Sequence, residues 1–175
     1  PPHRIGLAAS LNLGIDTARG ALLARFDSDD ICMPDRLARQ LAFMNDHPEI
    51  DVLGGAMEIM ADDETSLALR RYAIDHETIE RRFQWSNAIA HPTVMMRATT
   101  LQKNGAYDPD FRFAEDLDLW LRLLNAGVRF ANLDQVLVRY RQQNTRRQTD
   151  NWRYNLMARR KNFSFRQLPR RLAGI

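Results

Sequence analysis

The sequence predicts an α/β fold in which a sheet is layered against helices. Helical and extended patterns alternate along the chain, as they do in such layered folds. The 175 residues are 45% hydrophobic and 27% charged, which is typical of one ordinary globular domain. The single cysteine, Cys32, excludes a disulfide framework and a zinc site built from several cysteines. No apolar run approaches the roughly 18 residues of a membrane-spanning helix.

Two helices and two strands are expected in the first 60 residues. Apolar residues recur at helical spacing from Leu7 to Arg19, and Pro34 opens a second helix. The apolar run 21–26 predicts a buried parallel strand, and residues 50–55 predict another strand. The expected inward stripe of the second helix consists of Leu37, Leu41 and Met44.

Helices and strands continue to alternate after a polar turn at residues 62–65, which is expected to join two extended segments. The predicted elements are helix His76–Trp85, strand Thr93–Met96, helix Glu115–Ala126 and strands 128–133 and 136–140. From residue 142 the pattern is basic and only loosely helical. We therefore divide the chain into a body, residues 1–141, and a basic helical tail, residues 142–175.

The charge is distributed unevenly between these two parts. Residues 1–138 contain 14 basic and 21 acidic side chains, whereas residues 139–175 contain 11 basic side chains and one acidic side chain. Nucleic-acid binding needs a basic face that neutralises phosphates, so the acidic body is not expected to bind nucleic acid.

Three carboxylates follow the first predicted strand, at Asp27, Asp29 and Asp30. Ligands of α/β sheets bind beyond the carboxyl ends of strands, and Mg²⁺ or Mn²⁺ prefers carboxylate and phosphate oxygens. One interpretation is a metal ion that bridges the protein to a diphosphate. A second is a solvated turn that caps the next helix. A third is a phosphohydrolase in which Asp27 and Asp29 form a nucleophile pair.

A second acidic group, Glu115 and Asp116, stands at the start of a predicted helix. The helix dipole favours anions there, so we expect an ionised carboxylate that can act as a general base. The alternative is ordinary electrostatics of a helix start, and we assign Asp118 to that alternative.

Several short motifs follow one another in a definite order. They are Asn12-x-Gly14, Ala18-x-Gly20, Asp27-Ser28-Asp29-Asp30, Met33-Pro34-Asp35-Arg36, His91-Pro92-Thr93, Gly105-x-Tyr107-Asp108, Glu115-Asp116-x-Asp118 and Tyr140-Arg141. Over residues 3 to about 145 this ordered set resembles the family 2 glycosyltransferases, which are inverting enzymes with the GT-A fold.

The resemblance implies transfer of a sugar from a nucleotide-diphosphate sugar to an acceptor hydroxyl or amine with inversion, in cell-envelope or polysaccharide biosynthesis. It implies that Asp30 and Asp29 bind Mg²⁺ or Mn²⁺, and that Asp27, Asp29 and Asn12 contact the donor. Asp116 would be the catalytic base, and Glu115 would help position a saccharide or lipid-linked acceptor.

The resemblance also implies a GT-A-like, Rossmann-like mixed sheet flanked by helices, but N-terminally truncated. Family members usually begin with a strand–helix–strand unit that holds the nucleobase, and this chain starts after it. Because the first residue is not Met, we expect a piece of a longer product. A truncated, non-catalytic glycosyltransferase-like module is the alternative.

The tail combines arginines with large apolar residues such as Trp152, Leu156 and Phe163. Such a segment can lie on an anionic membrane surface, which would suit a lipid-linked acceptor, or it can pack as a helix on the acidic body. The expected location is the cytoplasm, with peripheral contact at the inner face of the membrane under the first alternative.

Overall fold

The computed structural model describes residues 5–142 and 148–163, with the side chains of residues 148–151 excepted. The helices are α1 Leu7–Thr17, α2 Arg36–Asp46, α3 His76–Phe83, the 3-10 turn η1 His91–Thr93, α4 Ala98–Asn104, α5 Glu115–Asn125 and α6 Gln148–Lys161. The strands are β1 Leu22–Ala24, β2 Ile31–Cys32, β3 Val52–Met60, β4 Ser66–Arg70, β5 Met95–Arg97 and β6 Phe130–Arg141.

The strands form one mixed sheet with the order β1-β5-β3-β6-β2, and β4 pairs with β3 as a hairpin. Only β3 and β6 run parallel, and every other recorded pairing is antiparallel. The mixed α/β sheet is therefore confirmed. The expectation of a buried parallel strand at 21–26 is wrong, because β1 is a short edge strand whose partner, β5, runs in the opposite direction.

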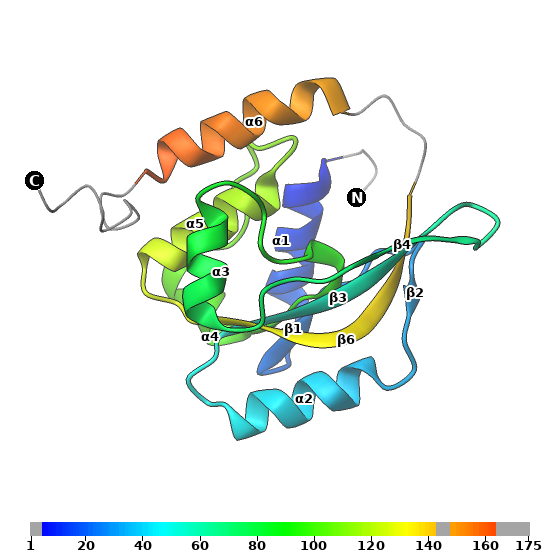
Figure 1. Ribbon diagram of the computed structural model, residues 1–175. Coiled ribbons are helices and arrows are strands. Elements are labelled where there is room, and N and C mark those ends of the chain that lie inside the picture. Colours follow the sequence, from blue (N-terminus) through cyan, green and yellow to red (C-terminus); the bar gives the residue numbers. More distant parts are fainter. Residues whose placement is uncertain (1–4, 143–147, 164–175) are drawn as a thin grey trace, which may run out of the picture.

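The sheet lies between two unequal layers of helices (Figure 1). Helix α2 covers one face, while α1, α3 and α5 lie on the other face and α6 lies outermost above α5. The larger hydrophobic core fills the space between the sheet and α5. The predicted helix at 115–126 is confirmed as α5, and its apolar residues Leu117, Trp120, Leu121 and Leu124 are all buried.

Helix α2 presents a different stripe to the sheet from the one expected. Leu37 and Leu41 are 54% and 47% exposed, and the buried residues are Arg36, Gln40 and Met44. The Arg36 guanidinium donates to the carbonyls of Arg25 (2.7 Å) and Val94 (3.3 Å). The Gln40 amide donates to the carbonyls of Leu53 (3.2 Å) and Thr93 (2.9 Å). Buried carbonyls need donors, so polar residues take the inward positions.

Other boundaries also differ from the sequence expectations. The two strands predicted at 128–133 and 136–140 are one long strand, β6, which begins at Phe130 and stays paired with β3 through two irregularities. The polar turn at 62–65 joins β3 to β4 as expected. Strand β2 and helix α4 were not predicted, because two and seven residues are too few to show a periodic pattern.

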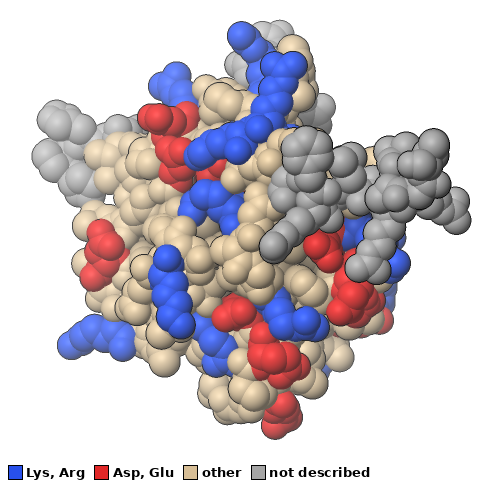
Figure 2. Space-filling view, turned by 90° about the vertical axis from the view of Figure 1, so that its left-hand side faces the viewer, with Lys and Arg blue, Asp and Glu red and all other residues tan. Residues whose placement is uncertain are grey.

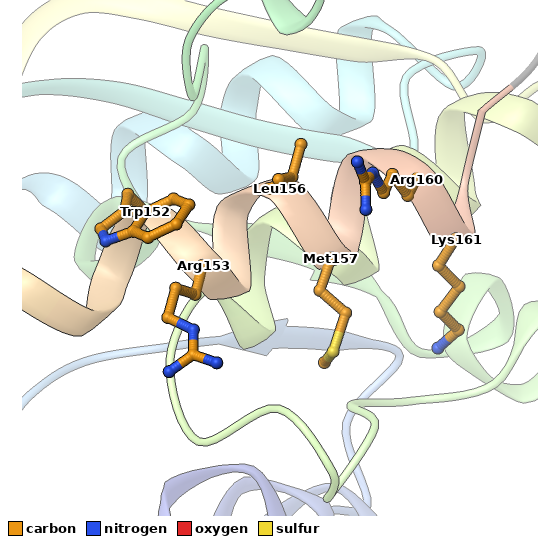
Figure 3. Close-up of a pocket in the computed structure, with 6 residues that line it drawn as sticks. All are labelled: Trp152, Arg153, Leu156, Met157, Arg160 and Lys161. Atoms are coloured by element: carbon orange, nitrogen blue, oxygen red, sulfur yellow. The ribbon is translucent and has the colours of Figure 1, made fainter.

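Basic side chains gather toward the top of the molecule in Figure 2, at the height of α6 in Figure 1. A groove of about 510 Å³ runs along α6 and is lined by Trp152, Arg153, Leu156, Met157, Arg160 and Lys161 (Figure 3). No helix among the described residues combines the length and apolarity needed to span a bilayer.

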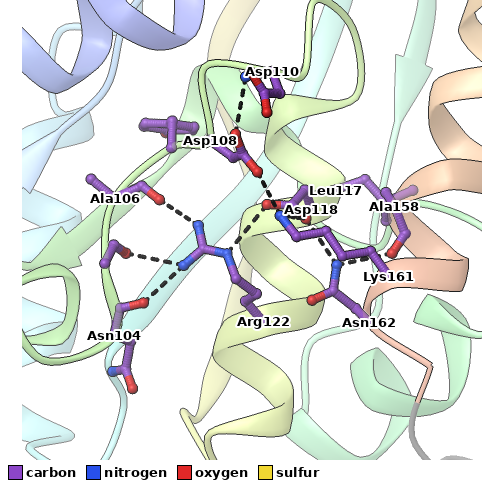
Figure 4. A network of polar contacts seen from close by, with 12 residues as sticks. Asn104, Ala106, Asp108, Asp110, Leu117, Asp118, Arg122, Ala158, Lys161 and Asn162 are labelled. Atoms are coloured by element: carbon purple, nitrogen blue, oxygen red, sulfur yellow. Dashed lines mark hydrogen bonds and ion pairs between the residues drawn. The ribbon is translucent and has the colours of Figure 1, made fainter.

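The inward side of α6 is anchored to α5 through Asp118, which is fully buried (Figure 4). Its carboxylate accepts from Arg122 Nε (3.2 Å) and Asn162 Nδ2 (2.9 Å) and lies 3.2 Å from Lys161 Nζ. Asp118 lies in the first turn of α5, as its assignment to helix-start electrostatics requires, and it is also the anchor of a polar network. Helix α6 packs on the body, which is the second of the two alternatives that we considered for the tail. Residues 143–147 and 164–175 lie outside the described part.

Candidate active site

The turn after β1 carries the three aspartates, and it places them in different environments. Asp30 is 9% exposed, and its Oδ1 accepts from the backbone N–H of Arg141 (2.9 Å). Its Oδ2 is buried without a hydrogen-bond partner among the described residues. Burial, with repulsion from Asp27 and Asp29, raises the pKa of Asp30 to about 6. A buried carboxylate oxygen without a partner is a suitable ligand for a divalent cation.

The three aspartates do not form a metal site by themselves. No three His, Cys, Asp or Glu side chains in the described part of the chain come close enough together to hold a metal ion. Asp29 is exposed, and its backbone carbonyl accepts from Arg141 Nε (2.9 Å). Mg²⁺ is commonly held by one or two carboxylates together with substrate phosphates. The residues present therefore fit an ion whose coordination a bound diphosphate completes.

Arg25 lies beside this turn, and it is a residue that our reading of the sequence did not select. Its side chain is 9% exposed, and Nη1 forms an ion pair of 2.6 Å with Asp27. Its Nε is buried without a partner among the described residues. The only sequence signal was an arginine inside an apolar strand, which is unusual because an unpaired buried cation is costly.

The second acidic group stands at the start of α5. Asp116 Oδ2 accepts from Asn87 Nδ2 (2.6 Å), and Oδ1 accepts from the N–H of Leu117 (2.8 Å). Ala114, the residue before Glu115, has a left-handed backbone with φ 57°. That conformation is uncommon for a residue with a side chain and is often found at functional sites.

Burial opposes the influence of the helix dipole, which was expected to keep a carboxylate ionised here. Desolvation by burial is the largest influence on both groups, and it raises the pKa of Glu115 to about 7 and raises that of Asp116. For Asp116 the hydrogen bonds from Leu117 and Asn87 and the charge of Arg25 oppose this rise. A carboxylate with a raised pKa is a stronger base once it is ionised.

The two acidic groups are within electrostatic range of each other. The charge of Asp27 helps to raise the pKa of Glu115, and the charge of Arg25 lowers the pKa of both Glu115 and Asp116. Since Arg25 is bonded to Asp27, it links the turn after β1 electrostatically to the start of α5.

Asn12 is used to hold a loop. Its Nδ2 donates to the carbonyl of Tyr107 (2.8 Å), and its Oδ1 accepts from the N–H of the same residue (2.9 Å). The Tyr107 hydroxyl in turn lies 2.8 Å from Nε2 of the buried His91. Asn12 thus fixes the backbone of the buried Tyr107, and contact between Asn12 and the donor stays a prediction.

We expect the substitution Glu115→Gln to remove a pH dependence of stability. The ordinary pKa of a glutamate is 4.5, and burial raises the pKa of Glu115 to about 7 in the folded protein, so the folded state binds the extra proton between these values. The free energy of unfolding of the wild type should therefore fall as the pH rises between these values and stay level above. Above the upper value the variant should be more stable by on the order of 3 kcal/mol. Urea unfolding across this pH range measures the effect.

The matched control is Glu77→Gln, because Glu77 is an exposed residue of α3 and should keep the wild-type profile. A wild-type free energy of unfolding that does not fall across this range would contradict the raised pKa of Glu115.

The chain is similar to several known glycosyltransferases. The family model described as "Glycosyl transferase family 2" matches residues 2–104. The amylovoran biosynthesis glycosyltransferase AmsE of Erwinia amylovora is 34% identical over 137 residues, which is 78% of this chain and 51% of that protein. The O-antigen biosynthesis glycosyltransferase WbnJ of Escherichia coli is 31% identical, over 77% of this chain and 53% of that protein.

The fold also matches a solved structure. The crystal structure of S. aureus TarS 1–349 in complex with UDP-GlcNAc superimposes with a TM-score of 0.64 at 17% identity, covering 87% of this chain and 46% of that one. This agreement confirms the expected GT-A arrangement. The chain spans about half the length of the relatives that it matches. Because the family model matches more than half of the residues of this chain, the chain belongs to glycosyl transferase family 2.

Proposed function

We propose that the protein transfers a sugar from a nucleotide-diphosphate sugar to a hydroxyl of a saccharide or lipid-linked acceptor, in the biosynthesis of a cell-envelope polysaccharide. The relatives support this, since one is named an amylovoran biosynthesis glycosyltransferase and another an O-antigen biosynthesis glycosyltransferase. The fold match to TarS solved with UDP-GlcNAc supports a nucleotide-sugar donor.

Asp116 is the proposed general base. Its carboxylate removes the proton of the acceptor hydroxyl as the acceptor oxygen attacks the anomeric carbon. The bond from that carbon to the diphosphate oxygen breaks, the diphosphate leaves with the electron pair, and the configuration at the carbon inverts. Asn87 and the N–H of Leu117 fix the orientation of the carboxylate, and Glu115 beside it positions the acceptor.

The donor side of the site is assigned to the turn after β1. Asp30, together with Asp29, would hold Mg²⁺ or Mn²⁺, and Asp27 would contact the donor. When bound, the ion would offset the negative charge that develops on the departing diphosphate. Arg25 lies where its charge can do the same from the protein side.

One observation carries the proposal: Arg25 is paired with Asp27 and its charge also acts on Asp116. A donor-binding turn and a general base can serve one reaction only if both face the same space. The phosphohydrolase alternative gains no support, because Asp27 is held by Arg25 and Lys161 is held by Asp108 and Asp118.

We expect Asp30→Asn to weaken donor binding that depends on metal. Removing one ligand charge should raise the Kd of UDP in the presence of Mn²⁺ on the order of a hundredfold, since losing even an outer-shell partner costs 10–100-fold. Titration calorimetry of the full-length protein with UDP, with and without Mn²⁺, measures this.

The control is Asp62→Asn, an exposed aspartate in the β3–β4 turn, which should bind UDP as the wild type does. Binding of UDP that is equally tight without metal would contradict the assignment of Asp30. Tight, metal-dependent binding with no sugar transfer to any acceptor would favour the non-catalytic alternative.

A further inference from the structure

The outward face of α6 combines apolar and basic side chains that the fold does not use. Trp152 is 63% exposed, and Leu156 and Met157 are each 41% exposed. Arg153 and Arg160 stand exposed among them. Trp152, Leu156 and Arg160 are four residues apart, as are Arg153 and Met157, so they share one side of the helix.

The opposite side of α6 is occupied by the body. Ala158 and Asn162 are buried against α5, and the Asn162 carbonyl accepts from Asn125 Nδ2 (2.9 Å). The guanidinium of Arg159 donates to the carbonyl of Phe83. The helix is thus held with a fixed side toward solvent, and the exposure of Trp152 is not a result of loose packing.

We propose that this outward face of α6 docks the protein on the surface of an anionic lipid bilayer. A helix with tryptophan and leucine among arginines binds in the interfacial region of a membrane, with its apolar side chains inserted and its cations beside the headgroups. This proposal rests on the proposed function, and it names the surface on which the protein would encounter a lipid-linked acceptor.

Charge complementarity selects anionic lipid over other occupants of this face. Residues 139–175 carry 11 basic side chains and one acidic side chain. Basic side chains gather at the same end of the molecule in Figure 2. Segments rich in Lys and Arg are attracted to anionic headgroups within about one Debye length. A neutral apolar partner would leave Arg153 and Arg160 unpaired on burial.

The inward side of α6 contacts the loop that leads to the proposed base. The Tyr154 ring of α6 packs edge-on against Phe113, with ring centroids 5.5 Å apart. Phe113 precedes Asp116 by three residues, so this pair joins α6 to the loop directly before α5. Docking through α6 would therefore bring the membrane surface, and any acceptor attached to lipid, to the side of the molecule that carries Asp116.

Vesicle co-sedimentation of the full-length protein tests the proposal without any sugar donor. We expect binding to phosphatidylglycerol/phosphatidylcholine vesicles that weakens with salt, and little binding to pure phosphatidylcholine. Two double variants should each reduce binding to the anionic vesicles about tenfold or more: Trp152→Ser with Leu156→Ser, and Arg153→Gln with Arg160→Gln. All four side chains are exposed, so thermal unfolding should match the wild type.

The matched control is Leu67→Ser with Leu69→Ser, two exposed leucines of β4, which should leave vesicle binding unchanged. Equal binding to both kinds of vesicle, or wild-type binding by both α6 variants, would overturn the proposal. A Trp152-dependent dimer in light scattering, with no vesicle binding, would also overturn it, because a second copy would then cover the face. Vesicle binding does not require Asp116, so failure here and failure of the proposed chemistry can be told apart.

Discussion

The substitution Asp116→Asn should lower the rate of sugar transfer by roughly 10²–10⁴-fold, the contribution of a positioned general base. An amide cannot take the proton of the acceptor hydroxyl, yet it can still accept from the N–H of Leu117, so the start of α5 should keep its shape. The donor is assigned to the turn after β1, so the Kd of UDP with Mn²⁺ should stay close to that of the wild type. Steady-state kinetics and calorimetry measure the two quantities.

The control for this experiment is Asp46→Asn. Asp46 is an exposed aspartate at the end of α2, on the opposite face of the sheet, and its substitution should leave both the rate and the Kd unchanged. If Asp116→Asn keeps the full rate, Asp116 is not the base. If it loses donor binding instead, the residue acts on the donor side.

The substitution Asp118→Ala should have the largest effect on stability. Asp118 is fully buried and faces Arg122, Lys161 and Asn162 (Figure 4). Removing this fully buried carboxylate takes away the acceptor that Arg122, Lys161 and Asn162 share, and loss of one partner of a buried ion pair costs about 3–5 kcal/mol. For a chain of this size the Tm should fall by on the order of 10 °C. Thermal and urea unfolding measure the loss, and hydrogen exchange should be faster in α6.

A matched control is available on the surface. Asp134 pairs with Arg71, and both side chains are 53% exposed. Asp134→Ala should therefore change the free energy of unfolding by about 0–1 kcal/mol, as exposed pairs generally do. An equal, small loss in both variants would mean that the Asp118 network does not hold α6 on the body.

The parts of the fold that were predictable are those with a strong local pattern. In α5 the apolar residues recur over three turns, and the helix and its buried stripe follow from that spacing alone. In α2 the same rule selected Leu37 and Leu41, which are exposed. The helix instead turns Arg36 and Gln40 inward, because backbone carbonyls from other parts of the chain need donors there. That need is invisible until the strands are in place.

The residues of the candidate site likewise fall into those that a local sequence pattern predicts and those that it does not. The aspartates at 27–30 and the pair Glu115 and Asp116 are local clusters, so the sequence revealed them. Asn87 reaches Asp116 across 29 positions, and no pattern around it predicts a hydrogen bond. Asp118 looked like helix-start electrostatics because its partners Lys161 and Asn162 come from α6, more than 40 positions away. Burial likewise raises the pKa of Glu115, and burial is a property of the folded chain that no local pattern shows.

The left-handed backbone of Ala114 bears on how the acceptor is received. A left-handed backbone destabilises a residue that has a side chain by roughly 1–2 kcal/mol. The fold nevertheless holds Ala114, directly before the two carboxylates, in this conformation. The direction of the Glu115–Asp116 pair is consequently set in the main chain before any substrate arrives. An incoming sugar would meet a preorganised base and would not have to spend its own binding energy on rearranging the loop.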